Sequence, residues 1–163
     1  MSRYLTTLLL LSGLSTAASA RDISFVERVE AQRAIEQVYW NHRLWPQENS
    51  GPKPPLAAVL PDAAVRARVQ DYLDKSNALE VWWRRPITAE QLQSELDRMG
   101  KDSPDRAVLR ELFAALGNDP FLIAETLARP SLADRLIRNW YASDARFHGE
   151  LRRAAELYPG AEI

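Results

Sequence analysis

Proline sets the first limit on how this chain can fold. The sequence contains ten prolines, and half of them fall between Pro46 and Pro61. Proline lacks a backbone N–H and fixes φ, so this density forbids a helix and disfavours a central strand. Residues 46–61 are therefore predicted to form a long extended arm, polyproline-like in conformation, that lies across helices through Leu56, Val59 and Leu60.

Helix-start signals divide the rest of the chain. Ser24 with Glu27 and Thr88 with Gln91 both have the spacing of a capping box, in which each side chain satisfies a free backbone amide. Further starts are expected where a proline stands beside a polar residue or ends a loop. These are Pro61 with Asp62, Ser103 with Pro104, Asp119 with Pro120, and the residues after Pro130.

Apolar residues recur at helical spacing after each of these starts. They predict helices over about 25–42, 62–78, 88–100 and 104–116, a short helix from 120, and a sixth after 130 that continues or breaks near Ser143 before a stop at Pro159 and Gly160. Gly100 and Gly117 are expected to close their helices in the left-handed conformation. No run shows sustained period-two alternation. The predicted fold class is all-α: an irregular multi-helix domain of about six helices with a Pro-rich extended arm.

The first twenty residues have the pattern of an export signal. Arg3 precedes an apolar stretch that includes Leu8–Leu11, and Ala18-Ser19-Ala20 fits the site that signal peptidase reads. We expect cleavage before Arg21, a periplasmic or secreted location, and a single helical domain over 21–163. The apolar stretch is shorter than the roughly 20 residues of a membrane-spanning helix, so no membrane anchor is expected.

Composition excludes several classes of function. The chain has no cysteine, so apolar packing must hold the fold without disulfides, and a lipid anchor on cysteine is excluded. Basic and acidic side chains are almost balanced, 21 against 22. A balanced surface has no sustained basic face, which argues against nucleic acid as the partner. No Gly-rich phosphate loop or metal-ligand spacing occurs, so no cofactor and no metal site are predicted.

Catalytic constellations are also lacking. The two histidines, His42 and His148, sit in no motif, although Asp144 precedes His148 by one helical turn. An unrecognised hydrolase using His148, Asp144 and Glu150 is a remote alternative. The carboxylates Glu27, Glu30, Glu36, Glu95 and Asp97 all fall on helix faces expected to be solvated. We assign no catalytic residue.

Aromatic side chains flank the arm on both sides. Tyr39, Trp40 and Trp45 precede it with Arg43, and Trp82 and Trp83 follow it with Arg84 and Arg85. If the two groups meet, they form an apolar, cation-edged groove suited to extended or proline-containing peptides. The alternative is that the rings pack beneath the arm as ordinary core. The predicted peptide-binding residues are Tyr39, Trp40, Arg43, Trp45, Trp82, Trp83 and Arg84.

One stretch carries a family resemblance. RRPITAEQLQSELDRM and RAVLRELFAALGNDPFLIAETLARPSLADRLI, within Arg84–Arg146, resemble the helical N-terminal chaperone region of SurA-like, parvulin-type periplasmic peptidyl-prolyl isomerases. The chain has no pattern for the family's separate isomerase domain. The resemblance therefore implies a chaperone-like module that binds unfolded or extended polypeptide without isomerase chemistry. The alternative is a structural or interaction domain of a larger secreted protein.

Overall fold

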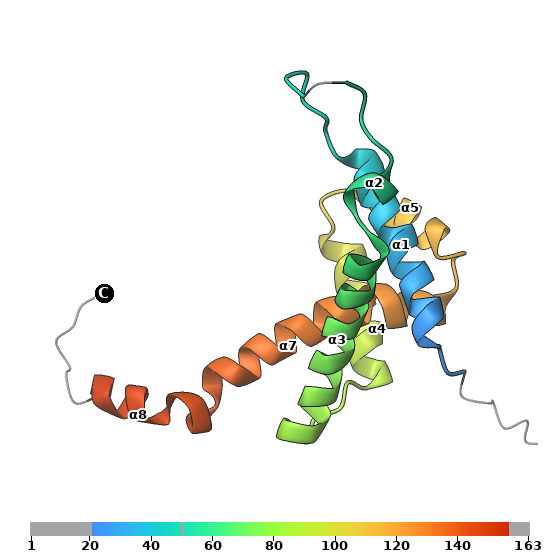
Figure 1. Ribbon diagram of the computed structural model, residues 1–163. Helices are drawn as coiled ribbons and strands as arrows, with labels where there is room; N and C mark the ends of the chain where they lie inside the picture. The colour runs from blue at the N-terminus through green and yellow to red at the C-terminus, as the bar shows by residue number, and fades with distance from the viewer. Residues whose placement is uncertain (1–20, 50, 157–163) are drawn as a thin grey trace, which may run out of the picture.

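The computed structural model describes residues 21–49 and 51–156 (Figure 1). The predicted signal peptide, residues 1–20, and the predicted stop at Pro159 and Gly160 lie outside the described residues. Within them every regular element is helical and none is a strand, which confirms the all-α prediction. Not one of these helices is both long and apolar enough to cross a membrane.

Helices α1 (Phe25–His42) and α3 (Asp62–Trp83) lie side by side and run in opposite directions (Figure 1). The predicted capping box at Ser24 and Glu27 starts α1. Val29 of α1 packs with Val65, Val69 and Tyr72 of α3 in one cluster of the core. The arm connects the two helices at the end where α1 finishes and α3 begins.

The remaining helices pack against α1 and α3 or against one another. Helix α4 (Ala89–Asp102) leads to α5 (Arg106–Ala115). After residues 116–119, one continuous helix contains α6 (Pro120–Ile123), η1 (Ala124–Ala128) and α7 (Arg129–Ser143). Helix α5 packs on α1, while α7 packs along α3. Helix α8 (Ala145–Glu156) follows a break at Asp144 and contacts α7.

The prediction of a separate helix after Pro130 is wrong, because Pro130 lies inside a continuous helix. The helix accommodates it with one π turn, in which the Arg129 amide bonds the carbonyl of Ala124, five residues back. In that register the carbonyl of Glu125 would pair with the amide that Pro130 lacks. Arg28 replaces the missing donor, with Nη1 at 3.1 Å from the Glu125 carbonyl oxygen.

The same guanidinium makes a buried ion pair. Arg28 Nη2 lies 2.8 Å from Glu125 Oε2, and Nη1 lies 3.4 Å from the Tyr72 hydroxyl. Arg129 donates to both oxygens of the Glu125 carboxylate. Arg28, Glu125 and Tyr72 are all buried. This cluster, the Arg28 network, joins α1, α3 and the π turn.

Other predicted boundaries also need correction. A density of prolines was expected to forbid helix throughout 46–61, but α2 (Leu56–Val59) forms one turn there, because no proline follows Pro55 until Pro61 and Leu56 is buried. Helix α3 continues past Ala78 to Trp83, since nothing breaks it before Pro86. It ends at Arg84, which adopts the left-handed conformation with φ 56°.

The end of α4 and the start of α5 also differ from the predicted positions. Gly100 does not end α4, which continues to Asp102, because Pro104 forces the preceding Ser103 to be extended and so sets the stop there. The N-cap of α5 is Asp105, not Ser103, and its carboxylate accepts from the amides of Ala107 and Val108. Gly117 does have a positive φ of 67°, as predicted.

The Arg28 network predicts a large loss of stability when Arg28 is replaced. Arg28→Met removes the side-chain donor to the Glu125 carbonyl and one of the two guanidinium groups that neutralise the buried Glu125 carboxylate, so the free energy of unfolding should fall by about 3 kcal/mol. Arg33→Met is the matched control, since Arg33 lies on the same helix in an exposed ion pair with Asp62 and should cost under about 0.5 kcal/mol. Urea unfolding measures both variants. Equal losses would contradict the role given to Arg28.

Candidate functional site

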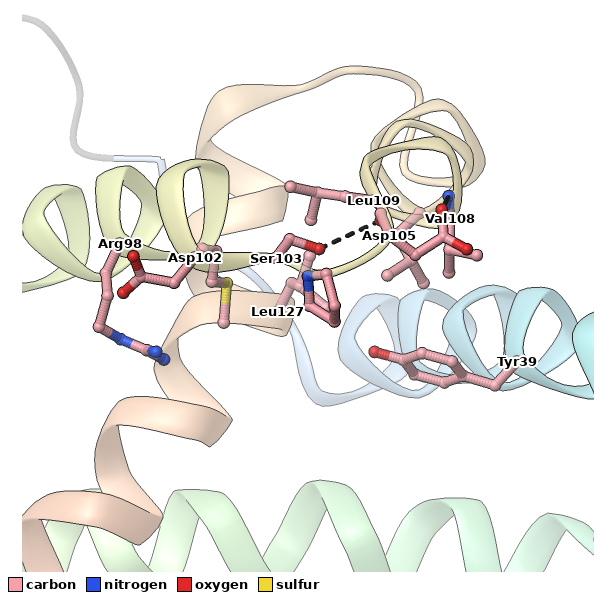
Figure 2. Close-up of a pocket in the computed structure, with 11 residues that line it drawn as sticks. Tyr39, Arg98, Asp102, Ser103, Asp105, Val108, Leu109 and Leu127 are labelled. Carbon is pink, nitrogen blue, oxygen red and sulfur yellow. Dashed lines mark hydrogen bonds between the residues drawn. The ribbon is translucent and has the colours of Figure 1, made fainter.

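A pocket of about 380 Å³ opens where α1, the α4–α5 connection and η1 meet (Figure 2). Its lining mixes an apolar floor with a polar rim. The lining residues are Tyr39, Arg98, Met99, Asp102, Ser103, Pro104, Asp105, Val108, Leu109, Leu112 and Leu127. We call it the Tyr39 pocket.

The floor of the Tyr39 pocket is set by how α5 and η1 present their apolar side chains. Leu112 is buried on the core side of α5, while Val108 and Leu109, one turn earlier, are only half-buried. The π turn presents Leu127 to the pocket (Figure 2). The hydrogen bond from Ser103 Oγ to the Asp105 carbonyl, 3.1 Å, and the Asp105 cap fix the start of α5. The floor is therefore held in place without a ligand.

Tyr39 forms one wall of the pocket, and its ring remains 48% exposed. Figure 2 shows its hydroxyl directed to the side where Leu127 lies. Partial burial raises the pKa of the Tyr39 phenol, and the negative charge of Glu36 raises it further, so the hydroxyl is a hydrogen-bond donor at neutral pH. Tyr39 also lines a second hollow of about 210 Å³, which includes Trp40, Arg43, Leu56 and Val59. Two hollows thus adjoin the same ring.

The rim of the pocket depends on Glu95, whose carboxylate was predicted to lie on a solvated helix face. That prediction is wrong, because Glu95 is only 1% exposed. Glu95 accepts from Arg98 on its own helix, and from Ser131 and Arg135 on α7. The arginine and serine donors hold the pKa of Glu95 at about 2, well below its usual range, despite burial. Glu95 therefore fixes α4 against α7 and positions Arg98 at the pocket.

Three of the predicted peptide-binding residues lie at this site. Tyr39 lines both hollows, and Trp40 and Arg43 line the second one. The indole of Trp40 donates to the Pro54 carbonyl at 3.0 Å, so it also serves as a platform for the arm. Trp45 lies edge-on to Trp40, with ring centroids 6.2 Å apart, and donates to the Gly51 carbonyl.

Trp82, Trp83 and Arg84 lie at the other end of α3 from the arm, so the structure does not join the two aromatic groups in one groove. The 22 residues of α3 separate them by about 33 Å at 1.5 Å per residue. Trp82 is 64% exposed there. Trp83 donates to the Asp144 carboxylate at 2.8 Å, and the Arg146 guanidinium lies over its ring.

The remote hydrolase alternative depended on Asp144, His148 and Glu150. Asp144 is engaged by Arg146 and by the Trp83 indole, and these donors lower the pKa of its carboxyl far below the usual range. The His148 ring lies edge-on to Tyr141. No group of three or more possible metal ligands occurs within residues 21–49 and 51–156.

Comparisons with known proteins add no identity. No family model, no curated protein and no solved structure matches this chain. The SurA-like resemblance of Arg84–Arg146 stays an expectation from the sequence.

The burial of Glu95 predicts a pH dependence of stability. Its pKa is lower in the folded chain, about 2, than its ordinary value of 4.5, so its contribution is complete above pH 4.5 and is lost as the pH falls toward 2. Glu95→Gln should lower the free energy of unfolding by about 1–3 kcal/mol at neutral pH, because the charge-assisted hydrogen bonds to the buried carboxylate are lost. The loss is no larger because Arg98 and Arg135 are half-exposed and can be hydrated by water instead. The free energy of unfolding of this variant should fall less steeply than that of wild type between pH 4.5 and 2. Parallel pH profiles from urea unfolding would refute this assignment.

Proposed function

We propose that this chain is an exported, chaperone-like helical module that binds extended or unfolded polypeptide at the Tyr39 pocket, without isomerase chemistry. The observation that carries the proposal is the open pocket of about 380 Å³ beside an exposed tyrosine ring. A second hollow, of about 210 Å³, also has Tyr39 in its lining and adds further surface for an extended segment.

The chemistry of the lining fits a polypeptide segment with apolar side chains. Leu109, Leu127 and Met99 offer an apolar floor for aliphatic or proline side chains. The Tyr39 hydroxyl and the Arg98 guanidinium can donate to peptide carbonyls at the rim, and Asp102 can accept from peptide amides. Aromatic-lined grooves take polyproline-type segments well, because these lose little conformational entropy on binding.

The sequence also supports the proposal. All of the lining except Tyr39 falls within Arg84–Arg146, the stretch that resembles the chaperone region of SurA-like proteins. The signal-like pattern of residues 1–20 predicts a location in the periplasm or outside the cell, where unfolded polypeptides arrive after export.

A second candidate function has its own observation. Trp82, Tyr141 and Phe147 are each about half-exposed or more near the α3, α7 and α8 ends, which favours an interaction domain of a larger exported protein. The neighbouring coding sequence tests this alternative, because an in-frame downstream domain would support it.

Client binding predicts suppression of aggregation. The protein should reduce light scattering by a chemically denatured client when it is present in a few-fold molar excess. Leu109→Asp places a charge on the apolar floor of the pocket and should abolish most of the effect, because a buried charge opposes an apolar guest. Leu109 is half-buried, so this variant should keep its helical circular dichroism.

Trp82→Ala is the matched control, since it removes a large exposed apolar ring away from the pocket. It should suppress aggregation as well as the wild type does. No suppression by the wild type, or a loss confined to Trp82→Ala, would overturn the proposal.

A further inference from the structure

The loop between α1 and α2 carries an apolar side chain into solvent. Leu44 is 88% exposed, the highest value among the exposed large apolar residues of the described chain. Figure 1 shows the loop extending beyond the end of α1, away from the helices of the core. An exposed leucine on a projecting loop has no role in the packing of its own chain.

The base of this loop is held firmly. Lys53 donates to the backbone carbonyls of Trp40, Asn41 and Arg43 at the end of α1. Its ammonium group also lies 4.8 Å from the centre of the Trp40 ring. The loop therefore presents Leu44 without the entropy cost of ordering a flexible segment on binding.

The Tyr39 pocket has the size and polarity to receive Leu44. A cavity of about 150 Å³, left by removal of one leucine side chain, takes up benzene. The Tyr39 pocket, about 380 Å³ and floored by Leu109 and Leu127, has room for Leu44 and part of a neighbouring residue.

Charges around the loop and the pocket are complementary. Arg43, which precedes Leu44, and Glu48, further along the loop, form no ion pair within the described residues. On the pocket rim Asp102 likewise has no cationic partner at ion-pair distance among those residues, and the Arg98 side chain is 46% exposed. A second chain can therefore pair its Arg43 with Asp102 and its Glu48 with Arg98.

We propose that the α1–α2 loop of one copy of this chain inserts Leu44 into the Tyr39 pocket of a second copy. The docking uses the pocket assigned to client binding and therefore rests on the proposed function. The loop of a second copy and a client segment compete for the Tyr39 pocket. Each chain carries both a loop and a pocket, so the contact is heterologous unless two copies exchange loops. One small loop buries less surface area than a standard protein–protein interface does, so self-association should appear at protein concentrations between roughly 10 µM and 1 mM.

Sedimentation velocity of the mature chain across that concentration range tests the proposal. The wild type should self-associate, and Leu44→Asp and Leu109→Asp should each remain monomeric. A mixture of the two variants should recover association, because the intact loop of Leu109→Asp fits the intact pocket of Leu44→Asp. Val81→Asp, an exposed apolar residue near the end of α3, is the control and should associate like wild type.

A monomeric wild type at 1 mM, or a mixture that fails to associate while the wild type does, overturns the docking. The two proposals fail separately. Leu44→Asp retains its own pocket and should still suppress client aggregation, so client binding without self-association removes only the docking. Self-association without suppression by either protein removes only the client-binding function.

Discussion

The guanidinium of Arg28 is the constraint on which the arrangement of the helices depends. Pro130 removes an amide from a continuous helix, and the π turn aligns the Glu125 carbonyl with that missing amide. Arg28 supplies the missing donor from α1 and neutralises the Glu125 carboxylate at the same time. Burial opposes ionisation of Glu125, but the hydrogen bonds from Arg129 and Arg28 outweigh it and lower the pKa of the carboxyl. One side chain thus fixes the register of Pro120–Ser143 against α1.

That register positions the candidate site. The π turn supplies Leu127 to the floor of the Tyr39 pocket, while Ala128, the next residue, is fully buried against Leu92 and Leu132. On the other side of the pocket, Glu95 ties α4 to α7 and leaves the Arg98 guanidinium at the rim. The pocket is consequently framed by two buried carboxylates that each bind two arginines.

Local signals in the sequence were sufficient for the fold class and for the starts of α1, α3, α4 and α6. The capping boxes at Ser24 and Thr88 and the Asp119 cap involve residues at most three apart, so no tertiary information was needed. The burial of Glu95 and the tolerance of Pro130 could not be predicted in the same way, because their partners Arg135 and Arg28 lie far away in sequence. The two aromatic groups would form one groove only if they met in space, but α3 places one at each of its ends. Of the predicted peptide-binding residues, only Tyr39, Trp40 and Arg43 line the two hollows, and the aliphatic floor was indistinguishable in sequence from ordinary core.

The proposed function depends on whether the Tyr39 pocket receives an extended apolar chain. An NMR titration of the ¹⁵N-labelled mature protein with a short proline-containing aliphatic peptide tests this most directly. Binding in the pocket should produce saturable shifts of the amides of Tyr39, Ser103, Leu109 and Leu127, with those of Trp82 and Phe147 unchanged. Saturable shifts confined to the ends of α3 and α8, or no shifts at millimolar peptide, would contradict it.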